Sequence, residues 1–186
     1  MAMPLRHRRF TVEQYHRMAE AGILHEDDRV ELIDGEIVEM SPIGDRHAAC
    51  VNKVNRAFSR QVGDRAIVSV QNPVHLPGDN EPQPDVSILR ARADFYAAGG
   101  HATTDILLAI EVADTSLAYD LDVKVPLYAR SGIPEVWVVD VERGRVHAFR
   151  DPAGGAYGTR ETIERGGTIA PRSIDAGAFA VGELLV

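Results

Sequence analysis

The sequence predicts a mixed α/β fold, in which a β-sheet carries helices on its faces. Residues 106–113 and 135–140 form apolar runs with the length and aliphatic content of buried strands. Between residues 45 and 62, apolar residues recur every three or four positions, which indicates an amphipathic helix packed on a core. Strand-like and helical segments alternate along the rest of the chain. This alternation favours a mixed sheet covered by helices.

The N-terminal segment predicts a helix followed by a β-hairpin. Thr11 is the expected N-cap, Gln14 completes a capping box, and Gly22 ends the helix. Residues 29–40 then contain two short apolar-polar runs separated by Asp34-Gly35. That dipeptide is typical of a two-residue turn between antiparallel strands.

Several short elements are expected before the first apolar run. They are strands at residues 66–70 and 73–76, a turn at 78–80, a strand from 86 and a short helix at 91–98. Pro84 fits only at the start of a strand or on a sheet edge, because proline cannot donate a ladder hydrogen bond. Asp85 is therefore expected where a strand begins.

After the first apolar run, residues 117–130 have helical spacing, but Pro126 lies inside that pattern. Proline removes a backbone hydrogen bond and clashes with the preceding turn, so the helix is either kinked or irregular in its first turns. A turn at 142–144 then connects the strand at 135–140 to a strand at 145–149. The weakly patterned remainder is expected to hold a last strand pair and a short C-terminal piece.

Size and composition favour one soluble domain that comprises residues 1–186. Cys50 is the only cysteine, so no intramolecular disulfide can form, which fits a reducing cytoplasm. No CxxC motif or His/Cys cluster suggests a zinc site. No stretch approaches the roughly 20 apolar residues of a membrane span. We therefore expect a cytoplasmic protein without a membrane partner.

The net charge of −8 argues against a protein that coats nucleic acid, because phosphate binding usually leaves a basic surface. It does not exclude an enzyme that reaches phosphates through bound metal ions, since those ions supply local positive charge.

Two acids predict a metal site. Glu111 lies inside the first apolar run, where a carboxylate is costly to desolvate unless it meets a cation or several donors, or stays protonated. If its strand neighbours the strand that follows Asp85, both carboxylates can converge on one divalent ion. Mg²⁺ prefers oxygen ligands, so Asp85, Glu111 and the carbonyl of Val112 form a suitable set. A nearby lysine would orient or deprotonate the attacking water, or neutralise charge in the transition state.

Short segments in a fixed order resemble the PD-(D/E)XK nuclease superfamily, and most closely its putative restriction endonuclease family, often called Uma-two. Each segment alone is weak, but the ordered series is fairly specific. The segments are Glu31-Leu-Ile-Asp-Gly-Glu36, Ser41-Pro42 with His47, Gln71-Asn72-Pro73, Glu81-Pro-Gln-Pro-Asp85, Glu111-Val112, Tyr119-Asp120 with Lys124, and Gly132-Ile-Pro-Glu-Val-Trp137-Val-Val-Asp140. They extend over residues 10–150, which are the expected core of the domain.

The resemblance implies a restriction-endonuclease-like sheet flanked by helices, with DNA as the substrate and Mg²⁺, or Mn²⁺ in its place, as the cofactor. It implies that Asp85 and Glu111 are catalytic metal ligands and that Glu31 is a further acid near the metal. One position departs from the superfamily pattern, in which a lysine stands two residues after the second acid, because this chain has Ala113 there. In this branch the lysine comes from the following helix, which makes it Lys124.

Each of these residues also has an ordinary structural interpretation. Glu111 can be a buried acid paired with Arg or Lys, and Asp85 can cap a turn. Asp120 and Lys124, four residues apart, can form a surface ion pair. Glu31 can be a solvent-facing strand residue. The joint order of the acids favours the catalytic interpretation.

Three functions remain in competition. The first is a magnesium-dependent endonuclease that acts on DNA, and a homodimer is expected for it, because two related sites can cut both strands. The second is a catalytically silent member of the same fold that serves as a binding or assembly module. The third is a metal-dependent hydrolase of a smaller phosphate ester. No GxxxxGK[ST], GxGxxG, HExxH or GxSxG segment supports another chemistry.

Overall fold

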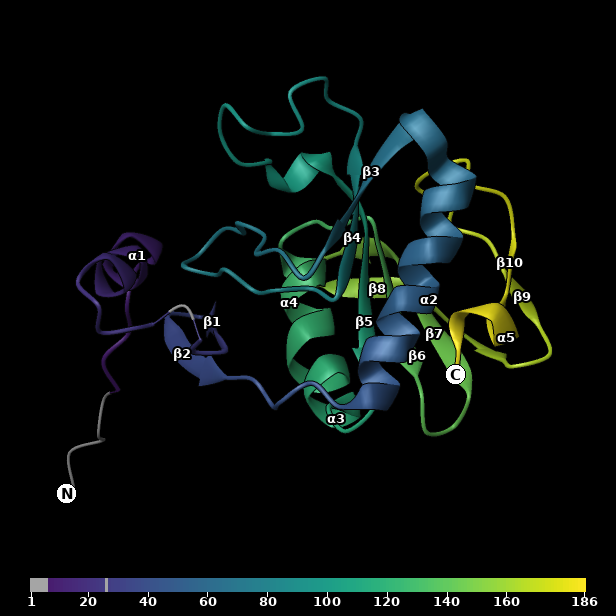
Figure 1. Cartoon of the computed structure of the whole chain (residues 1–186), viewed down its shortest axis with the longest axis horizontal. Coiled ribbons are helices and arrows are strands. Elements are labelled where there is room, and N and C mark those ends of the chain that lie inside the picture. Colours follow the sequence, from purple (N-terminus) through teal and green to yellow (C-terminus); the bar gives the residue numbers. More distant parts are fainter. Residues whose placement is uncertain (1–6, 26) are drawn as a thin grey trace.

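The computed structural model describes residues 7–25 and 27–186, and at its centre lies a six-stranded mixed sheet (Figure 1). Strands that are neighbours in the chain are neighbours in the sheet, and every pair is antiparallel except β5 with β6, which is parallel. The strands are β3 (Ala66–Val70), β4 (Val86–Arg90), β5 (Ile106–Ala113), β6 (Glu135–Asp140), β7 (Arg145–Ala153) and β8 (Ala156–Glu164). The predicted mixed sheet is confirmed.

Helices cover both faces of this sheet, as Figure 1 shows for α2 (Asp45–Val62) and α4 (Val125–Arg130). Under α2, the ring centroid of Phe58 lies 4.3 Å from that of Phe179 and 5.5 Å from that of Trp137. All residues of β5 are buried, because apolar groups pack against both of its faces. This double burial explains why the β5 sequence lacks the alternation of a half-exposed strand.

The predicted N-terminal helix and hairpin are both present. In α1 (Val12–Glu20), the Thr11 side chain accepts a hydrogen bond from the Gln14 N–H, and the Gln14 side chain accepts one from the Thr11 N–H. β1 (Val30–Ile33) and β2 (Glu36–Glu39) pair around a two-residue turn in which Asp34 and Gly35 have φ values of 50° and 75°. Positive φ at both positions matches the twist of the flanking strands.

Two of the short predicted elements are wrong. Residues 73–76 form no strand, because the N–H groups of Val74 and Leu76 donate to carbonyls within the same loop, at Pro82 and Asn80. Residues 91–98 form turns instead of a helix. There the Asp94 carboxylate accepts the N–H groups of Tyr96 and Ala98, and such local side-chain bonds compete with helical ones.

The segment with Pro126 is helical but changes its winding. α3 (Leu117–Tyr119) leads into a π-helical turn, η3 (Asp120–Lys124), and α4 follows directly. The N–H of Val125 donates to the carbonyl of Asp120, five residues earlier. Pro126 has no N–H to donate and lies in the first turn of α4, where a proline is tolerated. The expected irregularity in this helix is confirmed, and its form is a π-turn.

The remaining elements follow the expected pattern. η1 (Gly63–Arg65) and η2 (Thr103–Asp105) are short 3-10 turns, and neither was predicted. The C-terminal part adds a strand pair, β9 (Thr168–Ile169) with β10 (Phe179–Ala180), and the short helix α5 (Val181–Leu184). Across the described ranges, every helix is too short or too polar to cross a lipid bilayer.

Candidate active site

A cavity of about 380 Å³ lies where the β1–β2 hairpin, the start of α2 and the α3–η3 helix meet the sheet. The side chains of Asp85, Glu111, Lys124 and Glu31 all line it. The other charged or titratable lining residues are Arg29, Glu39, His47, Asp114, Tyr119 and Asp120. The fold therefore brings together the four side chains predicted for the site, although they come from separate parts of the chain.

The strand register places Asp85 beside Glu111. β4 and β5 pair antiparallel, with Val86 opposite Ile110, so the next step of the same register puts Asp85 opposite Glu111. The N–H of Gln71 donates to the Asp85 carbonyl over 3.0 Å, which continues the β3–β4 pairing past the end of β4. Residues directly opposite in antiparallel strands have Cβ atoms about 4.5–5.5 Å apart.

Both oxygens of Asp85 already accept hydrogen bonds. Oδ1 lies 2.8 Å from Nε2 of His47 and 3.3 Å from the donor Nε2 of Gln71, while Oδ2 accepts the N–H of Val112 over 2.8 Å. The hydrogen bond to Asp85 raises the pKa of His47, against the effect of its burial. The contact between Val112 and Asp85 is thus made by the Val112 N–H, whereas the sequence predicted its carbonyl as a metal ligand. The N–H and C=O of an extended residue point to the same side, so the carbonyl also faces this strand edge.

Glu111 is 2% exposed and is held through one oxygen. Its Oε1 accepts a hydrogen bond from the Tyr128 hydroxyl and lies 3.3 Å from Nζ of Lys124. Burial raises the pKa of Glu111 well above its ordinary value, although Lys124 opposes that shift. Glu111 therefore forms the buried pair with a lysine that was considered as its ordinary structural role. Its other oxygen, Oε2, has no hydrogen-bond partner among the described residues.

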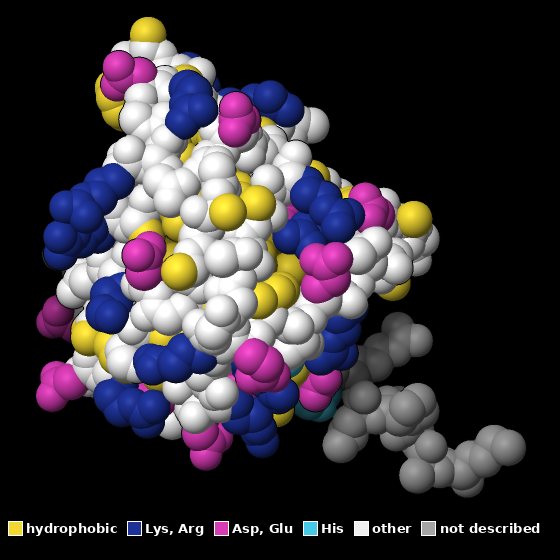
Figure 2. All heavy atoms as spheres, turned by 90° about the vertical axis from the view of Figure 1, so that its right-hand side faces the viewer, with side chains coloured by type: hydrophobic (Ala, Val, Ile, Leu, Met, Phe, Trp, Pro, Cys, Tyr) yellow, Lys and Arg dark blue, Asp and Glu magenta, His cyan; other side chains and the backbone are white. Residues whose placement is uncertain are grey.

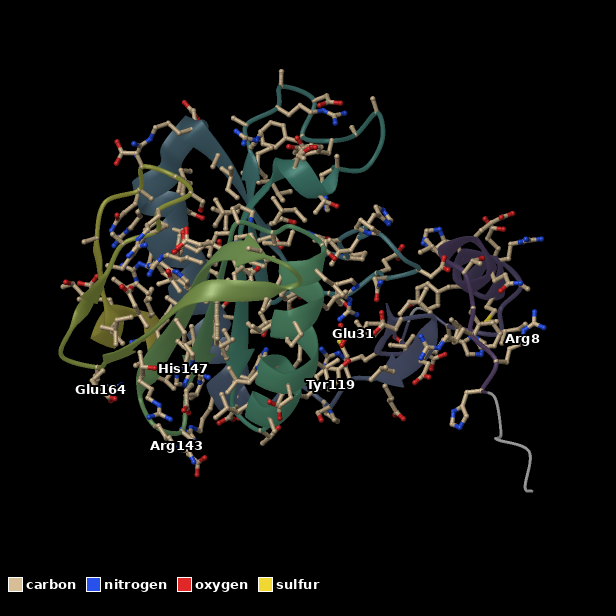
Figure 3. All side chains as sticks on the ribbon, turned by 180° about the vertical axis from the view of Figure 1, so that it is seen from behind. Arg8, Glu31, Tyr119, Arg143, His147 and Glu164 are labelled. Atoms are coloured by element: carbon tan, nitrogen blue, oxygen red, sulfur yellow. The ribbon has the colours of Figure 1, made fainter. Side chains whose placement is uncertain are left out.

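Glu31 and Lys124 form a second buried pair. Nζ of Lys124 lies 3.2 Å from Oε2 of Glu31, which also accepts the N–H of Gln83, while Oε1 of Glu31 accepts the Tyr119 hydroxyl (Figure 3). Burial alone would lower the pKa of Lys124, but Glu111 and Glu31 raise it above its ordinary value. Lys124 is therefore a cation. Glu31 is 1% exposed, so its interpretation as a solvent-facing residue is wrong.

Asp120 was not among the predicted site residues, yet it lines the cavity and is 3% exposed. Its carboxylate accepts a hydrogen bond from the Ser116 hydroxyl over 2.6 Å. Burial raises the pKa of Asp120 to about 6, although Lys124 opposes the shift. The surface ion pair considered for Asp120 and Lys124 is wrong, because both residues are buried. In the sequence, Asp120 and Lys124 were linked by their spacing of four and by one segment of the family resemblance.

The donor set fits a divalent cation. Carboxylates outnumber the cations that line the cavity, and burial raises the pKa values of Glu111 and Asp120, so their charged forms are costly there. A bound ion such as Mg²⁺ would supply compensating positive charge, and the donors are the oxygens it prefers. In the part of the chain that the structure describes, no three His, Cys, Asp or Glu ligand atoms of this cavity lie within 4.8 Å of one another. Backbone carbonyl and water would therefore complete the coordination of an ion held by Asp85 and Glu111.

Comparisons with known proteins give one family and one fold. Residues 12–179 match the model of a family described as "Uma2: Putative restriction endonuclease". Among solved structures, the chain is similar to a putative nuclease belonging to DUF820 from Anabaena variabilis, with a TM-score of 0.72, 17% sequence identity, and coverage of 94% of this chain and 97% of that one. At this identity the likeness shows the fold alone. No curated protein matches the chain.

Proposed function

The chain belongs to the Uma2 family of putative restriction endonucleases, and we propose that it is a metal-dependent endonuclease that hydrolyses phosphodiester bonds of DNA. The observation that carries the proposal is the placement of Asp85 opposite Glu111 in a cavity rich in carboxylates. Such a pair provides oxygen ligands at the point where two strands meet, in a cavity whose carboxylates outnumber its lysine and arginine side chains. Substrate and metal identity are inferred from the family together with this donor chemistry.

In this proposal, Asp85, Glu111 and the carbonyl of Val112 hold Mg²⁺, for which Mn²⁺ can substitute. When bound, the ion would supply positive charge to the phosphoryl oxygens and make a nearby water more acidic. His47 orients Asp85 through their 2.8 Å contact, which fixes one side of the carboxylate. Tyr128 does the same for Glu111, because its hydroxyl donates to Oε1 from the buried side.

Lys124 acts as a fixed positive charge instead of a general base. Glu111 and Glu31 keep its ammonium protonated, so it can donate hydrogen bonds to phosphate oxygens and offset the charge that develops on them. Glu31 has both oxygens engaged by Lys124, Tyr119 and Gln83. Its proposed role is therefore to position Lys124, and it does not ligate the ion directly.

Cleavage of supercoiled plasmid in Mg²⁺ or Mn²⁺ tests the proposal. Asp85→Asn and Glu111→Gln keep the size of each side chain but remove its charge, and each is expected to lower the cleavage rate by about 100-fold or more. The matched control is Glu164→Gln, which removes an exposed acid of β8 remote from the cavity (Figure 3) and is expected to cleave like the wild type. Cleavage that survives in both Asp85→Asn and Glu111→Gln would contradict the assignment.

A second function, a silent binding or assembly module, is favoured by one observation. Lys124 already pairs with both Glu111 and Glu31, as in a purely structural network. That module predicts intact plasmid with every metal tested and no Mn²⁺ binding in the cavity. Hydrolysis of small phosphodiesters with no salt-dependent affinity for duplex DNA would instead identify the smaller-ester hydrolase.

A further inference from the structure

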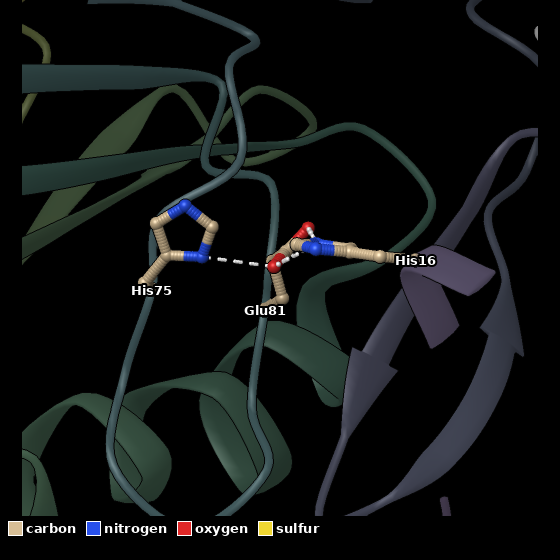
Figure 4. Close-up of side chains that lie close together, drawn as sticks. All are labelled: His16, His75 and Glu81. Atoms are coloured by element: carbon tan, nitrogen blue, oxygen red, sulfur yellow. Dashed lines mark hydrogen bonds and ion pairs between the residues drawn. The ribbon is translucent and has the colours of Figure 1, made fainter. Parts of the chain in front are cut away.

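A second cluster of ligand atoms lies outside the cavity, between the N-terminal helix and the loop that precedes β4. The cluster consists of His16 in α1 with His75 and Glu81 in that loop, and one ligand atom from each lies within 4.8 Å of the other two. Figure 4 shows the two imidazole rings on opposite sides of the Glu81 carboxylate. No local motif joins these residues in the sequence, which is why a search for CxxC or His/Cys spacing does not find them.

The distances are those of groups that can share one ion. Nε2 of His16 lies 3.0 Å and 2.8 Å from the two oxygens of Glu81, and Nδ1 of His75 lies 2.8 Å from Oε2. Ligands about 2.0–2.1 Å from a tetrahedral Zn²⁺ are slightly farther apart than this, so a small outward shift of the rings makes room for an ion. The Glu81 side chain is 6% exposed, whereas both histidines are 47% exposed, so an ion can enter from the solvent side.

Backbone contacts hold the ligands in place before any ion binds. The N–H of Glu81 donates to the Leu32 carbonyl over 2.7 Å, and the Leu32 N–H donates back to the Glu81 carbonyl. The N–H of Leu76 donates to the Asn80 carbonyl, which closes the loop between His75 and Glu81. Because the loop is closed and anchored on β1, only the exposed rings must move to admit an ion.

We propose that His16, His75 and Glu81 bind a divalent transition-metal ion of the Zn²⁺ type, with water in the fourth position. Two imidazoles and one carboxylate suit Zn²⁺ and its neighbours, whereas Mg²⁺ prefers the all-oxygen donors of the cavity. The site is separate from the proposed nuclease centre and does not depend on that function.

An ion bound by His16, His75 and Glu81 would link α1 to the loop that leads to Asp85. Glu81 pairs with Leu32, the neighbour of Glu31, and the Gln83 N–H donates to the Glu31 carboxylate over 3.1 Å. A bridge between His16 and Glu81 therefore joins the N-terminal helix to the part of the chain that positions Glu31. We expect bound Zn²⁺ to raise the melting temperature of the whole protein, because only the folded chain brings the ligands together.

The test is a Zn²⁺ titration of tag-free, chelator-stripped protein by calorimetry, repeated with Co²⁺ by visible absorption. Wild-type protein is expected to bind one Zn²⁺ and to give the strong absorption of four-coordinate, nitrogen-ligated Co²⁺. His16→Ala and His75→Ala are each expected to lose at least about tenfold in affinity and to lose the Co²⁺ spectrum. Asp85→Asn is expected to keep both, which separates this site from the cavity.

The matched control is His25→Ala, which removes an exposed imidazole outside the cluster and is expected to bind Zn²⁺ like the wild type. Should His75→Ala fail to fold, His16→Ala still tests the site, because its side chain lies on the outside of α1. Absence of stoichiometric Zn²⁺ binding by the wild type, or wild-type affinity in both His16→Ala and His75→Ala, would overturn the proposal and leave the three residues as a hydrogen-bonded group.

Discussion

Lys124 reaches Glu111 from the helix that follows β5, with Nζ 3.3 Å from Oε1. Position 113, where the superfamily pattern expects a lysine, holds an alanine that is 1% exposed. A side chain there belongs to the apolar group between the sheet and α4, so a charge at that position would displace core contacts. Because Lys124 in η3 places its ammonium beside Glu111, the chain needs no lysine at position 113.

The sequence reveals some of these residues better than others. Glu111 could be predicted, because an acid inside an eight-residue apolar strand is conspicuous in the sequence itself. Asp120 and Tyr128 could not be assigned to the site. Their contacts depend on how α3, η3 and α4 pack against the sheet and the hairpin, and helical spacing alone does not show which polar residues become buried.

Replacement of Asp120 tests the charge imbalance in the cavity. Its pKa is raised from 3.8 to about 6, so the folded protein binds this proton more tightly than the unfolded chain does. The free energy of unfolding of metal-free protein should therefore fall as the pH rises between those two values and stay lower above them. Asp120→Asn is expected to remove this part of the pH dependence and to raise the unfolding free energy at neutral pH by about 1–3 kcal/mol, measured by urea denaturation in a chelator.

Asp122→Asn provides the control, because Asp122 is exposed on the same π-helical turn. It is expected to leave the unfolding free energy within about 0.5 kcal/mol of the wild type. A pH profile of stability that is identical in Asp120→Asn and wild type would show that the Asp120 carboxylate is adequately compensated.

At the scale of elements, the π-turn sets the directions of two site side chains, which would differ in an ordinary α-helix. Asp120 and Lys124 bound this turn and are both buried, whereas Asp122 between them is exposed. The wider winding turns successive side chains by a smaller angle than an α-helix does. The sequence could predict a disturbance, because Pro126 removes a donor, but it could not predict that the extra residue would be accommodated before the proline.

Elements with strong local signals were predicted closely, and those governed by loop contacts were not. The predicted bounds of α2 agree with the structure, since its core-facing residues repeat with the helical period. The loop at 73–82 was misread in part as a strand. Its backbone donors bond within the loop and to β1, a contact between distant segments that no local pattern encodes.

The hairpin turn is sensitive to a single change at Gly35. A Cβ at Gly35 would stand 2.9 Å from the Phe10 carbonyl oxygen, and its φ of +75° is unfavourable for other residues. Gly35→Ala is therefore expected to lower the free energy of unfolding by about 1–3 kcal/mol in urea denaturation.

Gly166→Ala is the comparison, because a Cβ there has no neighbour within 4 Å and its φ is not in the left-handed region. It is expected to change the unfolding free energy by less than about 1 kcal/mol. Equal effects of the two substitutions would mean that the close approach of Phe10 to the turn does not constrain the hairpin.

At the scale of the whole molecule, the charge distribution predicts that the proposed binding of DNA depends on a bound ion. The chain carries a net charge of −8, and on the face in Figure 2 Lys and Arg side chains are interspersed with Asp and Glu instead of forming a basic patch. Phosphate binding without metal would bring DNA against an acidic cavity.

Duplex DNA should therefore bind more tightly when Ca²⁺, a divalent ion that usually supports binding without cleavage, replaces the chelator. Fluorescence anisotropy at constant ionic strength measures this gain, which we expect to be about tenfold or more and to disappear in Asp85→Asn. Equal affinity in Ca²⁺ and in chelator would mean that DNA binds elsewhere on the surface.

The overall architecture was predictable because helical and strand periods alternate clearly along the chain. The strand order was not, since the parallel pairing of β5 with β6 depends on the crossover through α3, η3 and α4.

We propose that residues 1–186 form one cooperative domain, that the protein acts as a homodimer, and that it works in the cytoplasm.

The most direct test of the central claim is an anomalous difference map from a crystal of the wild-type protein soaked in Mn²⁺. The account predicts a peak in the cavity about 2.1 Å from a carboxylate oxygen of both Asp85 and Glu111. A cavity without such a peak, with Lys124 still closed on Glu111, would contradict it.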